Sequence, residues 1–480
     1  MKRLIGYLTG AVLVAGLILA GCQVPTASGG TLRVVLPAKS SARDISSSTA
    51  IRLQLTRNGA IVSLSGGNYI EKSLGGAGQT VSVDGLSPGS GYVLLVSTGH
   101  YAGTGNFYNT DDFSKSDAFE ISAGVNTAVS VTLQTGRVAV LEGDNGPHGA
   151  TVLGSALYYL DGSNIYSTTN PTSPGSSYAS LGGASGVQSL SSDGSSELWL
   201  NTTAGIATNA NGSFAVSMFD DHGSSITPSV TDSGKAALGS NSFSYYYGSG
   251  LTAGLETSND SDWWTTDDLF NFSADIRSKL QGQMIRGVAY TSQFAAVATS
   301  IGAFRVESSM LTSASDLGTD FTNGTYNSSS ILLQPSDPTL LIGPVSAILS
   351  GSTAMIFGGT AKGLYAANVN STTGAPVSDG QTLSLVSGTQ GLNITKLATY
   401  GSVVNDGTVT GAYTVAYSAG TREVLVIRNQ TVIDRISAFE GLPSGDLRLT
   451  LYATSSNLYL VATGSDATVY VPLAVLQAAP

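Results

Sequence analysis

The residue with the most distinctive chemistry in this 480-residue chain is its one cysteine, Cys22. A thiol can form a disulfide, bind a metal or be acylated, and a disulfide needs a second cysteine, which the chain lacks. Cys22 follows Lys2, Arg3 and a mostly apolar run at 4–20. A charged start, an apolar middle and a small-residue cleavage site are typical of a secretory signal. The position of the thiol therefore favours acylation at a membrane.

The tetrapeptide LAGC at 19–22 resembles the lipobox of bacterial lipoproteins. The resemblance implies that residues 1–21 are a signal peptide that is removed, and that Cys22 carries fatty chains such as palmitate. Each buried methylene contributes about 0.8 kcal/mol, so several chains anchor a protein firmly in a bilayer. Gln23, where an aspartate would resemble an inner-membrane retention signal, favours the outer membrane of the bacterial cell envelope. An ordinary membrane-spanning anchor is the alternative, because such helices need about 17–25 residues.

A second candidate site is a possible binding loop in the stretch NDSDWWTTDD at 259–268. Its adjacent indoles, Trp263 and Trp264, lie beside Asp260 and Asp262. Tryptophan is enriched at binding hot spots, so the pair could stack on a sugar or grip a partner loop. The alternative is that one tryptophan packs in the core. Calcium needs six to eight oxygens at regular spacing, which the stretch lacks, so we predict no metal there.

Catalytic and cofactor-binding patterns are missing from the sequence. The three histidines, His100, His148 and His222, have no histidine or cysteine neighbour at the spacing of metal ligands, so we expect them to be structural. The glycine-rich stretches are not followed by the Lys-Ser/Thr pair of a phosphate-binding loop. We therefore predict no catalytic residue, no metal site and no cofactor.

The charge of the chain limits its partners. It has 21 basic and 32 acidic residues, a net charge of −11. Removal of the signal peptide would take away Lys2 and Arg3, leaving 19 basic residues and a net charge of −13. An acidic surface without basic runs argues against nucleic acid and anionic lipid as partners.

Strands must position these residues, because the chain is poor in charge and rich in Gly, Ser, Thr, Val and Tyr. Residues 22–30 read as a flexible tether. Alternating segments across 31–136 predict a β-sandwich. Within it, the turn GLSPG and the Tyr-led strand after it, at 85–96, resemble immunoglobulin-like and prealbumin-like sandwiches.

Residues 137–480 contain a repeat of apolar strands separated by short polar turns. The turn between the second and third strand of each copy recurs every 43 to 61 residues, close to the roughly 40–50 residues of a propeller blade. The markers of this turn are Gly162, Gly205, Gly250, Gly302, Gly363, Gly420 and Asp466. Seven markers predict an all-β propeller of seven blades. We expect one blade to be composite, completed by a strand at 137–142 or at 468–477.

The last copy, EGLPSGDLRLTLYATSSNLYLVAT at 440–463, resembles the propeller repeats of two-component regulators. A Gly-Leu-Pro turn, an aspartate and an aromatic strand ending in threonine carry the resemblance. The copy at 191–206 matches its second half. The resemblance implies a propeller, and the kinase-linked role of that family is not carried over, because the chain has no kinase segment.

Two functions fit these features. The first is a lipid-anchored envelope protein with a non-catalytic binding or scaffold role, whose propeller loops meet a protein or glycan partner. The second is an extracytoplasmic glycan-active enzyme with carboxylates at the propeller axis. Two carboxyl groups about 5–9.5 Å apart would favour the second function.

Overall fold

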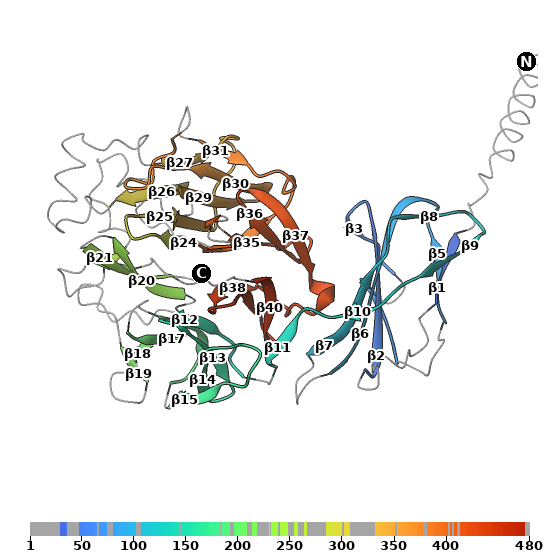
Figure 1. Cartoon of the computed structure of the whole chain (residues 1–480), viewed down its shortest axis with the longest axis horizontal. Coiled ribbons are helices and arrows are strands. Elements are labelled where there is room, and N and C mark those ends of the chain that lie inside the picture. The colour runs from blue at the N-terminus through green and yellow to red at the C-terminus, as the bar shows by residue number, and fades with distance from the viewer. Residues whose placement is uncertain are drawn as a thin grey trace, which may run out of the picture. The chain divides into compact units, whose positions relative to one another are not determined.

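The structure, a computed structural model, divides into two compact units, residues 1–99 with 111–135 and residues 100–110 with 136–480. Strands dominate both units (Figure 1), which confirms the all-β prediction. The residues that the structure describes are 29–35, 48–64, 67–73, 80–101, 107–143, 146–182, 184–192, 196–208, 214–217, 230, 232–238, 241–247, 254–257, 264–265, 285–299, 302–307, 332–350, 353–377, 382–401, 404–405, 408–409 and 413–475.

The first unit consists of a three-stranded sheet in the order β5-β1-β9 and a seven-stranded sheet in the order β10-β7-β6-β2-β3, with β4 on β2 and β8 on β6. Alternate side chains of β1, β2, β5 and β6 are buried in one shared core, as period-two patterning dictates. The strands are β1 (Gly30–Val35), β2 (Ala50–Arg57), β3 (Ala60–Ile61), β4 (Ile70–Ser73), β5 (Thr80–Leu86), β6 (Gly89–Tyr101), β7 (Tyr108–Lys115), β8 (Phe119–Ile121), β9 (Asn126–Ser130) and β10 (Gln134–Thr135).

Tyr92 holds the turn between β5 and β6. Its ring is buried, and its hydroxyl donates a hydrogen bond to the carbonyl of Ser87, 2.5 Å away. The guanidinium carbon of Arg57 lies 5.1 Å from the ring centroid. A tyrosine that bonds back to the chain a few residues upstream is a recurrent corner in antiparallel sandwiches. At this corner Gly89 has a φ of 143°, a backbone conformation that favours glycine.

The second unit is a succession of four-stranded antiparallel sheets. They are β12–β15, β16–β19, β20–β23, β32-β35-β36-β37 and β38-β39-β40-β11, with an eight-stranded sheet in the order β24-β25-β26-β27-β31-β30-β29-β28. The parallel pairing of β27 with β31 joins two antiparallel halves of that larger sheet. A separate two-stranded pair is β33-β34.

The bounds of these elements are β11 (Ala139–Glu142), β12 (Ala150–Leu153), β13 (Ala156–Asp161), β14 (Asn164–Thr168), β15 (Ser176–Ser180), β16 (Val187–Ser192), β17 (Leu198–Thr202), β18 (Gly205–Thr208), β19 (Ala215–Ser217), β20 (Asp232–Leu238), β21 (Asn241–Tyr247), β22 (Gly254–Thr257), β23 (Trp264–Thr265), β24 (Ile285–Tyr290), β25 (Phe294–Thr299), β26 (Gly302–Glu307), β27 (Leu332–Pro335), β28 (Val345–Ser350), β29 (Thr353–Thr360), β30 (Gly363–Asn368), β31 (Thr382–Leu385), β32 (Ile394–Tyr400), β33 (Val404–Asn405), β34 (Thr408–Val409), β35 (Tyr413–Ser418), β36 (Glu423–Arg428), β37 (Thr431–Ser437), the 3-10 helix η3 (Ala438–Glu440), β38 (Arg448–Ala453), β39 (Asn457–Thr463) and β40 (Thr468–Val475).

The sheet that contains β11 is composite, as the sequence predicts. Strand β11 pairs antiparallel with β40, so residue 139 lies opposite residue 470. Figure 1 shows β11 in turquoise and β40 in red, two distant parts of the colour scale. The two ends of the second unit therefore share one sheet.

A recurrent threonine turn joins the second and third strands in three of the four-stranded sets, one in the β16–β19 sheet and one in each half of the eight-stranded sheet. The hydroxyls of Thr202, Thr299 and Thr360 donate to the carbonyls of the glycines three residues later, over 2.8, 3.0 and 2.9 Å. Those glycines, Gly205, Gly302 and Gly363, have φ values of 125°, 152° and 151°, which favour glycine. They are three of the markers that the sequence repeat predicts.

Successive sheets bury their faces against one another. One core cluster joins β13 and β14 to β16 and β17, another joins β28 and β29 to β35 and β36, and a third joins β35 and β36 to β38 and β39. Leu157 of β13 is buried with Tyr452 and Tyr459 of the last sheet. The order of packing therefore returns from the last sheet to the first, which removes exposed sheet faces.

Candidate functional site

The sequence-predicted site residues fall almost entirely outside the described residues. Cys22 lies outside them, as do Asp260, Asp262 and Trp263. The backbone of Trp264 begins β23 and pairs with Leu255 of β22. Both site predictions stay predictions. Within the described residues, no helix is long and apolar enough to cross a membrane.

The first strands of the sheets meet at the centre of the second unit. Each of β12, β16, β20, β24, β28, β32 and β38 contacts the next, and β38 contacts β12. In a four-stranded antiparallel sheet the fourth strand ends where the first began. Short links such as 181–186 and 386–393 then start the next first strand at that same end. The beginnings of the seven first strands therefore lie at one end of the ring that these strands form, and we name this end the strand-start mouth.

The first strands carry a charge opposite to that of the whole chain. Their sequences hold four basic residues and one acidic residue, Asp232. The basic ones are Lys235, Arg286, Lys396 and Arg448. Four of these five charged residues, all but Lys235, occupy one of the first three positions of a strand. The charge is thus concentrated at the strand-start mouth.

Asp232 is held by a tyrosine of the neighbouring strand. The hydroxyl of Tyr247 donates to Oδ2 of Asp232 over 2.7 Å, and the two residues are direct partners in the β20–β21 register. The ring of Tyr247 stacks on Tyr245 with centroids 6.5 Å apart. Gly234 makes room for Tyr245, because a Cβ there would lie 2.5 Å from its hydroxyl. The aspartate is therefore fixed in place by a rigid pair of rings.

Burial and nearby charges shift the pKa values of Tyr245 and Tyr247. Burial, followed by the charge of Asp232, raises the pKa of Tyr245 and of Tyr247 well above the ordinary tyrosine value. The charge of Arg448, on β38, acts in the opposite direction on the pKa of Tyr247. Arg448 belongs to a sheet that is not adjacent to the β20–β23 sheet in the order of first strands.

The other two cations of the mouth differ in their partners. Nζ of Lys396 lies 2.8 Å from Oδ2 of Asp446, which precedes β38 and is 68% exposed. Arg286 is exposed and forms no ion pair with any described residue.

Buried polar side chains support the strands beside Asp232. The hydroxyl of Ser233 donates to Oδ1 of Asn201 over 2.6 Å and lies 2.7 Å from the hydroxyl of Ser191. The amide of Asn201 donates to Ser189 over 2.8 Å. These four residues are buried, and each has at least one partner. A satisfied network of this kind fixes β16, β17 and β20 relative to one another.

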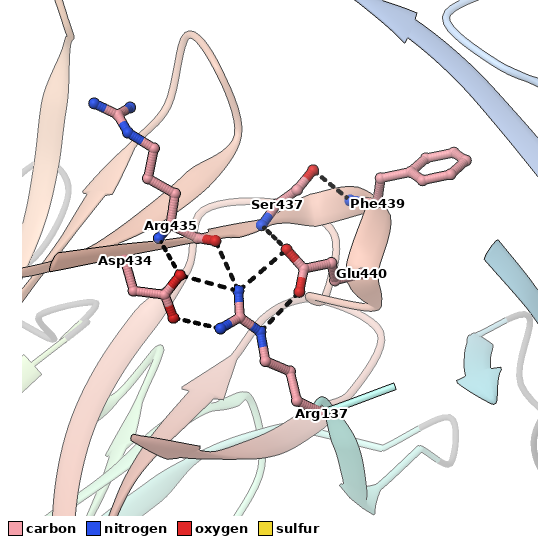
Figure 2. Close-up of polar contacts among 6 residues, drawn as sticks. All are labelled: Arg137, Asp434, Arg435, Ser437, Phe439 and Glu440. Carbon is pink, nitrogen blue, oxygen red and sulfur yellow. Dashed lines mark hydrogen bonds and ion pairs between the residues drawn. The ribbon is translucent and has the colours of Figure 1, made fainter. Parts of the chain in front are cut away.

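In a second charged cluster, the guanidinium of Arg137 is held by hydrogen bonds within the protein (Figure 2). Nε of Arg137 donates to Glu440 over 2.8 Å, Nη1 donates to Asp434, and Nη2 donates to the carbonyl of Arg435 over 2.7 Å. Glu440 also accepts from the backbone N–H of Ser437, as part of a capping box on η3. Burial lowers the pKa of Arg137, but the hydrogen bonds and charge of Glu440 and Asp434 outweigh it and raise that pKa. With its donors engaged, Arg137 ties the chain just before β11 to β37 and η3.

His148 is buried, and its Nδ1 lies 2.5 Å from Oε2 of Glu142, which is also buried. The pair spans the connection between β11 and β12. Among the described residues, no group of three potential metal ligands occurs. The position agrees with a structural histidine, and the sequence did not indicate the glutamate as its partner.

The glycan-active alternative needs two carboxylates at the axis. Among the residues of the first strands, all in described segments, Asp232 is the one carboxylate. The strands themselves therefore do not supply the pair of groups that this alternative requires.

Sequence reasoning missed the strand-start mouth. Asp232, Arg286 and Arg448 are far apart in the chain and belong to no motif. A usable signal was present, because basic residues recur at the start of predicted first strands in an acidic chain. It could be interpreted only once the strand bounds were known.

A scan against protein-family models gives no match, and a search of the curated proteins gives none either. Similar solved structures include the AfRom2 CNH domain (TM-score 0.38, 10% identity, covering 70% of this chain and 99% of that chain). They also include YCF48 from Cyanidioschyzon merolae (TM-score 0.40, 11% identity, 70% and 96% covered) and the gluconolactonase XC5397 from Xanthomonas campestris (TM-score 0.30, 8% identity, 61% and 86% covered). The chain is thus similar in structure to β-propeller proteins. With TM-scores below 0.5, nothing about its ligand or activity follows.

Proposed function

We propose that this protein is a non-catalytic binding protein of the bacterial cell envelope, anchored by lipid on Cys22. In this proposal residues 31–136 form a β-sandwich and residues 137–480 form a seven-bladed β-propeller. The propeller binds a protein or glycan partner at the strand-start mouth, and the outer membrane is the expected location.

The observation that carries the binding role is the convergence of charged side chains on the strand-start mouth. Asp232, Arg286 and Arg448 each lie within the first two positions of a first strand, on three different sheets whose first strands form a closed order. Concave sites with a few convergent polar groups are the usual places for ligands. Arg286 is exposed and forms no ion pair among the residues that the structure describes.

The seven-bladed arrangement is supported by the sheets themselves. Six antiparallel sets of four strands lie entirely within 150–437, counting each half of the eight-stranded sheet as one set. The composite sheet of β11 with β38–β40 would be the seventh blade. Closing a ring with strands from both ends of the chain protects the sheet edges that would otherwise meet solvent.

The anchor is tested by Cys22→Ser in a bacterial expression host. We expect the wild-type protein to incorporate labelled palmitate and to sediment with membranes. The Cys22→Ser protein should lose the label and no longer be processed at residue 21. Thr26→Ala, in the expected tether, is the matched control and should behave as wild type. Equal labelling of Cys22→Ser and wild type would refute the lipid anchor.

The absence of catalysis is tested with the mature protein and a panel of envelope and plant glycans. We expect no released sugar after prolonged incubation. Released product that disappears in Asp232→Asn would instead assign the axis carboxylate to a glycan-active enzyme.

A further inference from the structure

We propose that one end of the first unit is a membrane contact, and that its turns lie on the headgroups of the bilayer that holds the lipid on Cys22. The turns are 58–59, 87–88 and 122–125, which we name the tether-end turns. This proposal rests on the lipid anchor proposed above and identifies the surface that the anchor brings to the membrane. The partner is a bilayer of zwitterionic phospholipid.

The strand register places all three turns at the end of the first unit where β1 begins. Gly30 opens β1 and lies opposite Leu86, which ends β5. Gly89 opens β6 and lies opposite Ile121, which ends β8. Strand β2 runs antiparallel to β6, so the turn after β2 lies beside the start of β6. The chain that enters β1 therefore comes from the same end as the tether-end turns.

The stretch of chain between the lipid and the first unit is short. The backbone at Gly29 already runs tightly along β5, because a Cβ there would lie 2.8 Å from the Cα of Gly85. Seven residues, 22–28, separate this point from the membrane, and a flexible chain of that length spans about 15 Å on average. Strand β1 extends the first unit by about 20 Å beyond its starting residue. The tether-end turns are therefore the part of the first unit that is held nearest to the lipid.

The charges at this end suit a neutral lipid surface. None of the eight residues of the tether-end turns is charged, although the chain has a net charge of −11. The cation beside them, Arg57, donates to the carbonyls of Pro88 and Ser90 over 3.3 and 3.4 Å. The nearest acids along the chain, Asp84 and Glu120, lie within β5 and β8. Turns without carboxylates avoid repulsion by lipid phosphates, and one arginine is too little to require an anionic lipid.

Val125 gives the same end an apolar contact. Its side chain is 52% exposed. Its carbonyl accepts a hydrogen bond from the N–H of Thr31 over 3.2 Å, and its own N–H donates to the carbonyl of Ser122 over 3.3 Å. The backbone is thus fixed while the side chain stays open to the outside. A weak apolar contact is sufficient here, because a short tether gives an effective concentration in the millimolar range.

The test is amide hydrogen exchange of the mature chain, residues 22–480, with Cys22 coupled chemically to a maleimide phospholipid. The coupled protein is measured on vesicles of phosphatidylethanolamine and phosphatidylcholine. The same chain coupled to a small soluble maleimide, mixed with the same vesicles, is the reference. We expect exchange in peptides that cover 122–125 to slow about threefold or more on the vesicles. Peptides that cover the start of β5, at the opposite end of the first unit, should exchange equally in the two samples.

Two matched variants decide whether the tether-end turns make the contact. Val125→Glu places a carboxylate where the apolar side chain meets the lipid, and its exchange on vesicles should return to the reference rate. Val35→Glu makes the same change at the far end of β1, where the valine is 41% exposed, and should keep the protection at 122–125. Both valines are exposed, so both variants should fold and melt as the wild-type protein does.

Three results of this experiment would overturn the proposal. They are exchange at the reference rate at 122–125 in the vesicle-bound protein, protection at the start of β5 instead, or full protection in Val125→Glu. Each of them leaves the lipid anchor standing, because the coupling to Cys22 is chemical and the palmitate experiment tests the natural anchor separately. Failure of the palmitate experiment would reject the anchor and, with it, this contact in the cell.

Discussion

At the scale of single residues, ion pairs in this chain divide into those that can bind a ligand and those that hold the fold. Glu440 is 6% exposed and accepts hydrogen bonds from both Arg137 and the η3 cap. An almost buried carboxylate depends strongly on its partner, because an unpaired charge in that position keeps its full desolvation penalty. Figure 2 shows the guanidinium of Arg137 between the carboxylates of Asp434 and Glu440, which leaves it little to offer a ligand.

Replacing Arg137 with methionine keeps the length of the side chain and removes the charge. We expect Arg137→Met to lower the free energy of unfolding by about 1–2 kcal/mol, since the pair is partly exposed and weaker than a fully buried one. The melting temperature should fall by about 3 °C. Arg286→Met, which removes an exposed cation with no ion pair among the described residues of the same unit, is the control and should change little. An unaltered melting curve for Arg137→Met would show that the cluster does not stabilise the fold.

At the scale of elements, the turns show how much a sequence can reveal. The predicted markers Gly162, Gly205, Gly302 and Gly363 all lie between the second and third strands of their sheets. They were detectable because a glycine with positive φ is a local requirement, and Gly205, Gly302 and Gly363 each follow a threonine by three residues. Gly250, by contrast, lies outside the described residues.

The threonine of such a turn should contribute measurably to stability. Thr360 is 2% exposed, donates to Gly363 O over 2.9 Å and accepts from the N–H of Lys362. We expect Thr360→Val to lower the free energy of unfolding by about 1–2 kcal/mol, because a buried carbonyl and a part-buried N–H lose a partner while the volume stays similar. Thr431→Val, at an exposed position of β37, is the control. Urea denaturation measures the difference, and equal midpoints for the two variants would contradict the role assigned to the turn.

The same locality explains what the sequence could not predict. The all-β class, the repeat and the composite sheet follow from patterns within a few dozen residues, and the structure confirms them. The Arg137–Glu440 contact joins residues 303 positions apart, and the packing of Leu157 with Tyr452 and Tyr459 depends on the return of the last sheet to the first. Contacts of this kind form only when the second unit folds completely, and the sequence around one residue gives no information about its distant partner.

At the scale of the whole molecule, the pairing of β11 with β40 holds the two ends of the second unit together. Val140 lies opposite Val469 in that pairing, and Val469 is fully buried. Every blade in a closed ring shields its neighbours, so a break at this sheet exposes edges and faces on both sides.

A disulfide can test this pairing directly. In a Cys22→Ser background, we expect Val140→Cys with Val469→Cys to crosslink under mild oxidation, because directly opposed strand residues have suitably close Cβ atoms. The crosslinked chain should migrate faster in a denaturing gel, and its melting temperature should rise. Val140→Cys with Val461→Cys places the second thiol one strand further in, on β39, and should stay reduced. Crosslinking of the control pair alone would contradict the composite sheet.

The composite sheet also has a consequence for biosynthesis. A ribosome makes β11, which ends at Glu142, long before it makes β40, which begins at Thr468. Domains usually begin to fold as they emerge, but this one cannot finish until its final strands are released. A chain that stops early leaves β11 without its partner, and that orphan strand is a template for pairing with other nascent chains. The partly synthesised chain must therefore stay protected from aggregation until β38–β40 have been made.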